Sequence, residues 1–379
     1  MKTPVGRFVM GKGFILFLCV VAAVLGVLHF FVWKTAVLFF EVTGGAGQIA
    51  LGFALTILAM SFILASILSH RSDAAPVRFW YTASAVWLGI FHHLVIASGL
   101  MWLVFPFVLK YGGIERLPTL AGVFFLGAAI ASAFAAWNAN RITVRELSVR
   151  VRDLPDSWRG KTAVVFSDVH LGHVHAARFL ERVVTRVSTL APDVVFIPGD
   201  LFDGPKIDMA ASAAPLKKLH APLGVYCSIG NHDLFAGVEK ATEALAASGV
   251  TVLRDAVREV AGVQVIGVDY RMAEMEEELT PILSRMAFDP TRPSIMLHHA
   301  PVAIEQSAKA GISLQLSGHS HQGQLWPFNY LTRLVYGGYD GGLRVAGGLV
   351  VYTSPGVGTW GPPLRTGSRA EVARIHFIG

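Results

Sequence analysis

The sequence has little cysteine, and its first third has few charged residues. Only two of its 379 residues are cysteines, Cys19 in an apolar run and Cys227 in an expected strand. Segments of such different character are poor disulfide partners, so we predict neither a disulfide framework nor a cysteine-based zinc site. A G-x-S-x-G serine elbow and a cysteine in a polar setting are also missing, which argues against catalysis by a side-chain nucleophile.

Long apolar runs, by contrast, are abundant near the amino terminus. Residues 1–140 contain only 11 of the 32 Lys plus Arg and 26 Asp plus Glu residues, and the whole chain is 53% hydrophobic. Crossing a bilayer takes about 20 mostly apolar residues. The first run is too long for a signal peptide and lacks a small-residue cleavage site, so we interpret it as an uncleaved helix. The sequence predicts a membrane region at 1–140, with spans at about 14–33, 49–69, 84–108 and 119–138, followed by a separate domain at 141–379.

The formal net charge of +6 and the pI near 9.4 have a topological explanation. With four spans, nine Lys or Arg residues fall at the amino terminus, in the middle loop and after the fourth span, against three in the other two loops. The positive-inside rule then predicts a cytoplasmic carboxyl-terminal domain, and nucleic acid is not the expected partner. We interpret His92 and His93, near the middle of the third span, as neutral imidazoles hydrogen-bonded within a bundle, although a functional path through the membrane is the alternative.

After Ile142 the pattern changes to short β-branched runs that alternate with amphipathic segments and Gly, Pro or Asp turns. This pattern is typical of an α/β domain. Helices are expected at 176–190, 206–219, 238–247 and 272–286. Strands are expected at 163–167, 194–198, 225–229, 263–268, 294–297 and 313–316, with a hairpin at 345–352.

Five polar blocks each follow one of these strands. In open α/β sheets, ligands bind outside the carboxyl ends of the strands. The blocks supply carboxylates, imidazoles and one amide, a donor set that suits manganese, iron or zinc better than calcium. So many ligands indicate two ions, about 3.5–4 Å apart, which share a water that attacks a phosphoryl group in line. The blocks are FSDVH (166–170), IPGD (197–200), SIGNHD (228–233), LHHAP (297–301) and LSGHSH (316–321).

Together the blocks resemble the D-x-H, G-D, G-N-H-D/E, lone-His and G-H-x-H pattern of the calcineurin-like metallophosphoesterases, over about residues 160–379. The resemblance implies a two-sheet αββα sandwich after the transmembrane region. It also implies two divalent ions, manganese first, with iron, zinc, magnesium or nickel as alternatives. By the same resemblance Asp168, His170 and His321 bind one ion, Asn231, His299 and His319 bind the other, and Asp200 bridges them.

The resemblance also suggests catalytic partners. It implies that His232 stabilises the transition state or protonates the leaving oxygen, and that Asp233 orients this imidazole. His299 is preferred to His298 as the ligand, because the family's lone His is followed by one residue and Pro, and neighbouring strand side chains point to opposite faces. Asp203 is expected to hydrogen-bond the loop or a ligand histidine.

Two further residues are candidate substrate contacts. His173, and less so His175, could reach a substrate phosphate, although solvated loop histidines are the alternative. The segment SPGVGTWGPPLRTGSRAEV at 354–372 resembles a membrane-attached bacterial branch that includes hydrolases of lipid-linked sugar nucleotides of the UDP-diacylglucosamine type. This second resemblance places Arg365 where a phosphate contact is plausible, and a solvent-facing arginine is the alternative.

The expected function is therefore hydrolysis of a phosphodiester or pyrophosphate bond at a bacterial inner membrane, in a substrate carrying a lipid. The reason for the lipid is that four helices exceed what an anchor requires. An enzyme for soluble nucleotides or phosphoproteins is the alternative, because the same site chemistry serves different substrates. A non-catalytic membrane sensor or transporter is a third hypothesis, and it predicts missing ligands, whereas every expected ligand is present.

Overall fold

The computed structural model of the chain describes residues 12–270 and 275–378. These residues divide into two compact units. A helical unit contains the chain up to Leu68 together with Ala83–Ser132. An α/β unit contains Ser69–Thr82 and the chain from Ala133 onward. The expected boundary after residue 140 coincides with the end of a helix, whereas the contacts assign the last turns of that helix to the α/β unit.

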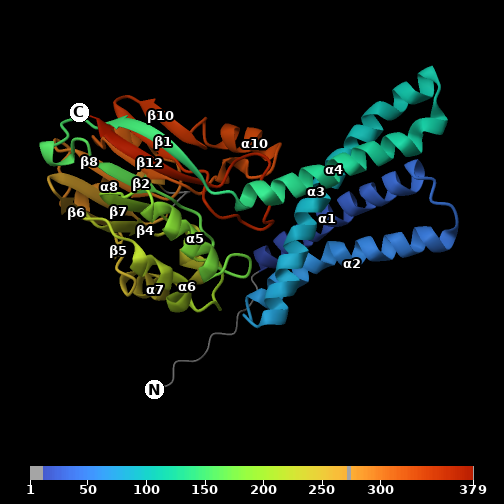
Figure 1. Cartoon of the computed structure of the whole chain (residues 1–379), viewed down its shortest axis with the longest axis horizontal. Helices are drawn as coiled ribbons and strands as arrows, with labels where there is room; N and C mark the ends of the chain where they lie inside the picture. Colours follow the sequence, from blue (N-terminus) through green and yellow to red (C-terminus); the bar gives the residue numbers. More distant parts are fainter. Residues whose placement is uncertain (1–11, 271–274, 379) are drawn as a thin grey trace. The chain divides into compact units, whose positions relative to one another are not determined.

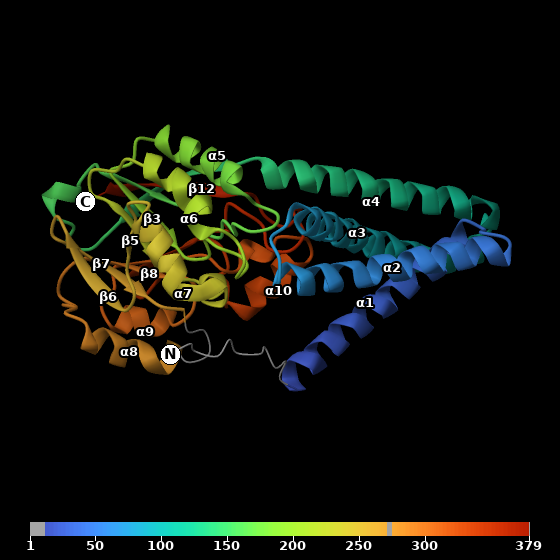
Figure 2. The same ribbon diagram turned by 90° about the horizontal axis from the view of Figure 1, so that it is seen from below.

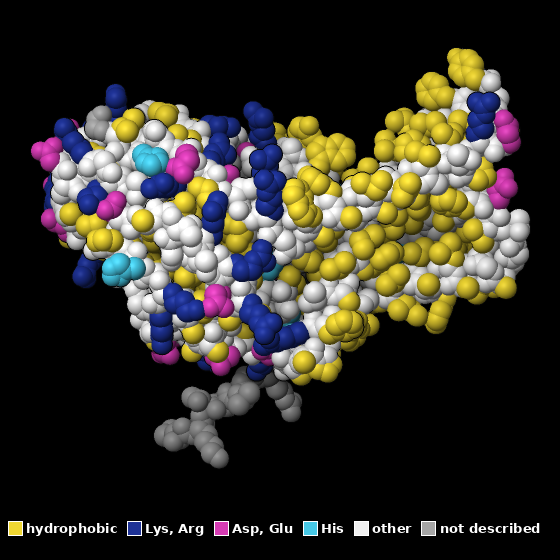
Figure 3. Space-filling view, viewed as in Figure 1, with side chains coloured by type: hydrophobic (Ala, Val, Ile, Leu, Met, Phe, Trp, Pro, Cys, Tyr) yellow, Lys and Arg dark blue, Asp and Glu magenta, His cyan; other side chains and the backbone are white. Residues whose placement is uncertain are grey.

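Four long helices account for the amino-terminal region, as predicted. Each is long and apolar enough to cross a membrane, and hydrophobic side chains cover much of their visible surface, while Lys and Arg lie mainly over the α/β unit (Figure 3). Within the helical unit, His93 Nδ1 lies 2.9 Å from Ser132 Oγ, which agrees with the interpretation of a hydrogen-bonded imidazole. The helices are α1 (Lys12–Phe39), α2 (Gly45–Ser69), α3 (Ala75–Tyr111) and α4 (Leu117–Asn140).

The α3 helix begins nine residues before the predicted span. Its first turns carry Arg78 and several aromatic and small polar residues, which lower hydropathy without preventing a helix. Hydropathy detects the apolar centre of a span, whereas the helix ends where the backbone hydrogen bonds end. The basic residues Lys2 and Arg7, used to predict the orientation, lie outside the described residues.

The α/β unit contains two six-stranded sheets in its described part (Figure 1). The first has the order β1–β12–β2–β3–β4–β5, with β2 to β5 parallel. The second has the order β10–β11–β9–β8–β7–β6, with antiparallel β6 and β10 at its edges. The strands are β1 Thr143–Arg150, β2 Thr162–Val165, β3 Val194–Pro198, β4 Val225–Ser228, β5 Thr251–Val252, β6 Ala256–Val260, β7 Val263–Val268, β8 Ser294–His298, β9 Leu314–Ser317, β10 Gly342–Ala346, β11 Leu349–Thr353 and β12 Glu371–Ile378.

Three apolar layers hold the two sheets and their helices together. Both faces of the central strands are buried, which is why their sequences are continuous apolar runs. Alternate residues of these strands, such as Val165 and Leu297, meet between the sheets. On the outer faces Val164 packs with α5, α6 and α7, and Met296 packs with α8 and α9 (Figure 2). The arrangement is an αββα sandwich, and it confirms the predicted fold class.

The helices of this unit follow the expected order but differ at their ends. Burial of Leu180, Val184 and Val187 shows one apolar face on α5, as its spacing predicts. The described α8 begins at Met275, so the first three residues of the predicted helix 272–286 lie outside the described part. The helices are α5 Ala177–Ser188, α6 Met209–Ala213, α7 Asn231–Ala246, α8 Met275–Arg285, α9 Ile304–Lys309 and α10 Phe328–Val335.

Candidate metal centre

The five polar blocks meet at the carboxyl ends of β2, β3, β4, β8 and β9. Asp168 and His170 follow β2, and Asp200 follows β3. Asn231 begins α7 directly after β4, while His299, His319 and His321 follow β8 and β9 of the other sheet. Since parallel strands present these ends at the same edge, seven residues separated by up to 153 positions become neighbours.

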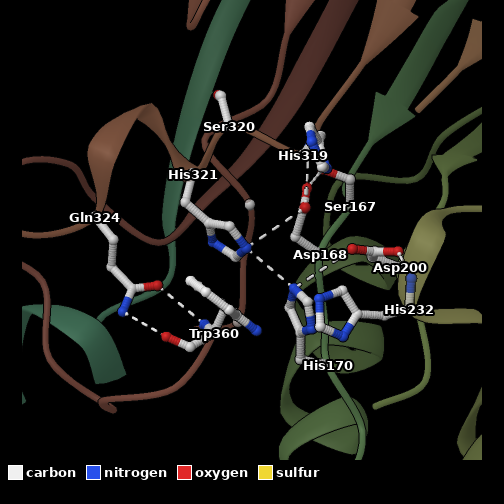
Figure 4. Close-up of polar contacts among 12 residues, drawn as sticks. Ser167, Asp168, His170, Asp200, His232, His319, Ser320, His321, Gln324 and Trp360 are labelled. Carbon is white, nitrogen blue, oxygen red and sulfur yellow. Dashed lines mark hydrogen bonds and ion pairs between the residues drawn. The ribbon is translucent and has the colours of Figure 1, made fainter. Parts of the chain in front are cut away.

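The side chains form two groups joined by the Asp200 carboxylate. Figure 4 shows Asp168, His170 and His321 together with Asp200. Asp168, His170 and His321 offer ligand atoms that all lie within 4.8 Å of one another, and so do Asp200, His299 and His319. The Nε2 atoms of His170 and His321 are 3.0 Å apart. Asp200 Oδ2 lies 3.1 Å from His299 Nε2 and 3.8 Å from His170 Nε2, so this carboxylate lies between the groups.

Several of these residues have a left-handed backbone conformation that is uncommon for residues other than glycine. The φ angles of Asp168, His170, Asp200, His319 and His321 lie between 48° and 70°. Such left-handed geometry costs of order 1 kcal/mol or more per residue and clusters at functional sites. The loops after the strands are therefore strained at five predicted ligands. The left-handed backbone at these positions turns each side chain toward the common centre.

Two glycines of the motifs are required by the close approach of the carboxylates. A Cβ atom at Gly230 would overlap the Asp200 carboxylate, and one at Gly318 would overlap that of Asp168. Any larger residue would displace the carboxylate or the loop. The glycines in G-N-H-D and G-H-S-H thus make room for the acids of the neighbouring blocks.

Burial and hydrogen bonding prepare these groups to bind cations. Burial lowers the pKa of His170 to about 4 and, together with the positive charge of His299, that of His319 to about 3. Both imidazoles are then neutral at pH 7, the form that binds metals. His299 Nδ1 donates to the Pro198 carbonyl at 2.7 Å, which leaves Nε2 for a ligand.

Unpartnered polar atoms also point to cations at this centre. Asn231 Oδ1 is buried without a hydrogen-bond partner among the described residues. His299 Nε2 likewise has no hydrogen-bond partner among the described residues, although Asp200 Oδ2 is 3.1 Å away. Buried polar atoms are normally paired, so a group of them beside two carboxylates fits divalent ions.

The two acids near His232 exchange the roles expected from the sequence. His232 Nδ1 donates to Asp203 Oδ1 at 3.0 Å. Asp233, predicted to orient this imidazole, instead accepts from the backbone N–H groups of Asp200, Leu201, Phe202 and Gly230, at 2.8 to 3.0 Å. The reason is that Asp233 lies in the first turn of α7, where its carboxylate points back into the β3 loop. Asp203 orients the histidine, and Asp233 holds the loop that carries Asp200.

Replacing Asp203 with Asn should slow turnover without removing metal. The hydrogen bond that fixes the ring of His232 weakens, and loss of such a supporting group typically costs about 10- to 100-fold in activity. Metal content by mass spectrometry and the initial rate on an aryl phosphodiester measure the two effects. Asp233→Asn provides the contrast, because it weakens backbone contacts of the Asp200 loop and should lower metal content as well. Equal metal loss in both variants would contradict this division of roles.

His173 does not lie where a substrate phosphate contact was predicted. Its side chain is 4% exposed, and Nε2 donates to the Ser72 carbonyl at 3.1 Å. Its own carbonyl accepts from Thr82 at 3.2 Å, and its ring lies against that of Tyr81. His173 therefore holds the α2–α3 connection against the loop after β2.

His175 is also buried rather than solvated. Its Nε2 lies 2.9 Å from Thr359 Oγ1 and accepts from the backbone N–H of Thr359 at 3.1 Å. The ring stacks on Phe179 of α5, with centroids 4.2 Å apart. His175 thus ties the loop after β2 to the 354–360 segment.

Replacing His173 with Ala should loosen residues 69–82. One buried hydrogen bond and one ring contact are lost, together about 1 kcal/mol, which corresponds to amide exchange roughly five- to ten-fold faster in that segment. Hydrogen exchange followed by mass spectrometry resolves peptides from this connection. The exposed His220 provides the control. Unchanged exchange at 69–82, or the same change in His220→Ala, would contradict the assigned role.

Arg365, a second predicted substrate contact, is fully buried. Its guanidinium donates to the carbonyls of Pro355 and Gly358 and to Ser368 Oγ. Burial lowers its pKa to about 10, so it stays cationic at neutral pH. A nitrogen of the guanidinium lies 3.2 Å from His321 Nδ1. Arg365 therefore supports a predicted ligand and the 355–358 turn, and the sequence missed this because an Arg in a Gly- and Pro-rich segment usually faces solvent.

Comparison with known proteins agrees with this geometry. Residues 161–323 match the family model of the calcineurin-like phosphoesterases. A zebrafish (Danio rerio) "transmembrane protein with metallophosphoesterase domain" is 34% identical over 61% of this chain and 56% of its own length. An uncharacterized metallophosphoesterase of Aquifex aeolicus is 31% identical over 63% of this chain and 92% of its own length. One of Campylobacter jejuni is 26% identical over 86% of this chain and 89% of its own.

The match thus covers only a little over half of the zebrafish relative, and nearly all of the Aquifex one. The family model spans the blocks from FSDVH to GHSH, which supply all seven predicted ligands. The helical unit lies outside the segment that this model matches. The chain belongs to the calcineurin-like metallophosphoesterase family.

Proposed function

We propose that this protein hydrolyses a phosphodiester or pyrophosphate bond with the help of two divalent metal ions. One observation carries the proposal: two groups of buried or half-buried candidate ligands lie on either side of Asp200, whose Oδ2 is within 4 Å of a histidine from each group. Manganese suits this oxygen and nitrogen set, as do iron and zinc. When bound, such ions would activate a water molecule and offset the charge of the phosphoryl oxygens.

The chain's own residues hold and align the reactants. Asp168 is fixed by Ser167 Oγ and by the backbone N–H of His319 at 2.9 Å, so its orientation is set before any ligand binds. Asp200 Oδ1 accepts from the backbone N–H of His232 at 2.8 Å, which leaves Oδ2 toward the histidines. Preorganised groups of this kind need little rearrangement during the reaction.

His232 is the proposed proton donor to the leaving oxygen. Burial lowers its pKa, but the hydrogen bond to Asp203 and the charge of Asp200 outweigh burial and raise the pKa to about 9. Since Nδ1 is engaged by Asp203, Nε2 is the atom available to the substrate. Bound cations would lower this pKa again, toward the range in which a histidine can both donate and accept a proton at neutral pH.

A lipid-linked substrate at a membrane surface is the finer part of the proposal. The four apolar helices exceed what tethering requires. The ring of Trp360, whose residue is 58% exposed, lies 6.2 Å from that of His232 and adds apolar surface at the site. We also propose that the α/β unit lies on the cytoplasmic side of a bacterial inner membrane, as the distribution of Lys and Arg indicates.

A comparison of substrates tests this function. Detergent-purified full-length protein with manganese would be given an aryl phosphodiester, a phosphopeptide, a cyclic nucleotide and a UDP-linked acylated sugar, with Asp200→Asn as the inactive control. The proposal expects turnover of the diester and faster turnover of the acylated sugar nucleotide. Turnover of the soluble substrates alone would reject the lipid assignment and favour the soluble-nucleotide or phosphoprotein alternative. Metal-independent turnover, equal in Asp200→Asn, would reject the metal mechanism.

A further inference from the structure

The α10 helix, Phe328–Val335, has its apolar side turned outward. None of its eight residues is buried. Phe328, Leu331, Leu334 and Val335 are 47%, 55%, 79% and 63% exposed, at the i, i+3, i+6 and i+7 spacing of one helix face. The inward side is polar instead: Thr332 Oγ1 donates to Asp340 Oδ2 at 3.1 Å. A surface helix of a soluble domain has the opposite orientation.

Two exposed tryptophans extend this apolar face. Trp326 comes just before α10 and is 47% exposed, and Trp360 is 58% exposed. Gln324 connects their loops, because its Oε1 accepts from the backbone N–H of Trp360 at 3.0 Å and its Nε2 donates to the Trp360 carbonyl at 3.1 Å. We call Trp326, Phe328, Leu331, Leu334, Val335 and Trp360 the outward face.

Residues next to the outward face contact the last turns of α4, which belong to the α/β unit. Leu325 and Leu364 form one apolar cluster with Ala135 of α4. The backbone N–H of Arg365 donates to the Ala135 carbonyl at 3.0 Å, and Asn138 Nδ2 donates to the carbonyl of Arg365 at 3.0 Å. Leu325 directly precedes Trp326, so the outward face begins one residue from a contact with α4.

The end of α4 has the composition of a membrane–water boundary. Trp137 is 55% exposed, and the guanidinium of Arg141 lies over its ring at 5.2 Å. Trp and Tyr gather at this boundary, and basic residues lie just beyond it. The segment 325–339 likewise contains one Trp, three Tyr and one Arg, and it has no Asp or Glu.

We propose that the outward face lies in the headgroup region of the bilayer that holds α4. An amphipathic helix with aromatic and aliphatic residues on one side and basic residues nearby binds in this way, and the absence of acidic residues suits anionic phospholipids. The proposal concerns α10 and its neighbours rather than the reaction. It holds whether or not the centre hydrolyses a lipid-linked substrate.

A fluorescent label on the outward face tests the contact. Full-length protein with Cys19→Ala and Cys227→Ala would carry a single new cysteine at Leu334→Cys, labelled with an environment-sensitive dye. The protein would be reconstituted in vesicles of phosphatidylcholine and phosphatidylglycerol. The control is Asp156→Cys, whose native side chain is 91% exposed and precedes β2, at the sheet edge opposite the metal centre.

The expected result is quenching of the Leu334 label by phospholipids that carry a nitroxide on the acyl chain, with iodide quenching about five-fold weaker than for the Asp156 label. Equal iodide quenching at both positions, without lipid quenching, would overturn the proposal. Protection from iodide without lipid quenching would also overturn it, because a second copy or a protein partner would then cover the face.

Discussion

Asp200→Asn should abolish hydrolysis and remove metal from both halves of the centre. Asn preserves the size of the side chain and one oxygen that can accept from the backbone of His232, but it removes the negative charge between two cations. Losing several kcal/mol of such stabilisation corresponds to a rate lower by about 10³-fold or more. Metal content per protein and the initial rate on an aryl phosphodiester measure both effects.

The matched variant His232→Ala separates metal binding from proton transfer. Its Nδ1 is engaged by Asp203, and its ring lies against that of His170 with centroids 4.7 Å apart, but it is not one of the seven predicted ligands. The variant should therefore keep its metal while turnover falls by about 10²- to 10⁴-fold. A small rate loss in Asp200→Asn, or equal metal loss in both variants, would contradict the bridging role proposed for Asp200.

Arg365→Met should strongly destabilise the α/β unit. The guanidinium is fully buried, and its removal leaves the carbonyls of Pro355 and Gly358 without their donor. Unsatisfied buried groups of this kind cost about 3 kcal/mol together, which lowers Tm by roughly 10 °C for a unit of this size. Thermal unfolding in detergent, followed by the intrinsic fluorescence, measures the change.

The neighbouring Arg369 provides the control for this experiment. It is exposed, so Arg369→Met should shift Tm by less than about 2 °C. Because Arg365 lies against the ring of His321, its loss should also lower metal content at temperatures well below unfolding. A Tm like that of Arg369→Met, or full metal occupancy, would show that the buried contacts of Arg365 are dispensable.

Local patterns were sufficient for the elements whose signal lies in one stretch of chain. The four apolar helices and the central strands were predicted because hydropathy and β-branched runs are properties of consecutive residues. The edge strand β1 and its neighbour β12 were missed. Thr143 pairs with Glu371, and their mixed polar sequence becomes a strand only when the other strand is beside it.

In the candidate site, too, some roles could be predicted from consecutive residues and others depended on the tertiary structure. Asp203 and Asp233 are both acids close to His232 in sequence or in space, and no local rule tells which of them bonds the imidazole. The first turn of α7 directs Asp233 toward the amides of the β3 loop, so the assignment depends on the angle between a helix and a sheet. Arg365 is comparable, because its burial results from packing against α4 and the 355–358 turn.

The scarcity of cysteine in the whole chain argued against a disulfide framework. The scarcity of charged residues in the first third indicated membrane helices. The sequence alone also predicted the candidate ligand types and their order, because each block follows its strand directly. Only the tertiary structure decided which acid orients His232, that His173 and Arg365 are held inside, and that α10 turns its apolar side outward. These outcomes depend on contacts between residues far apart in the chain, which hydropathy and spacing do not encode.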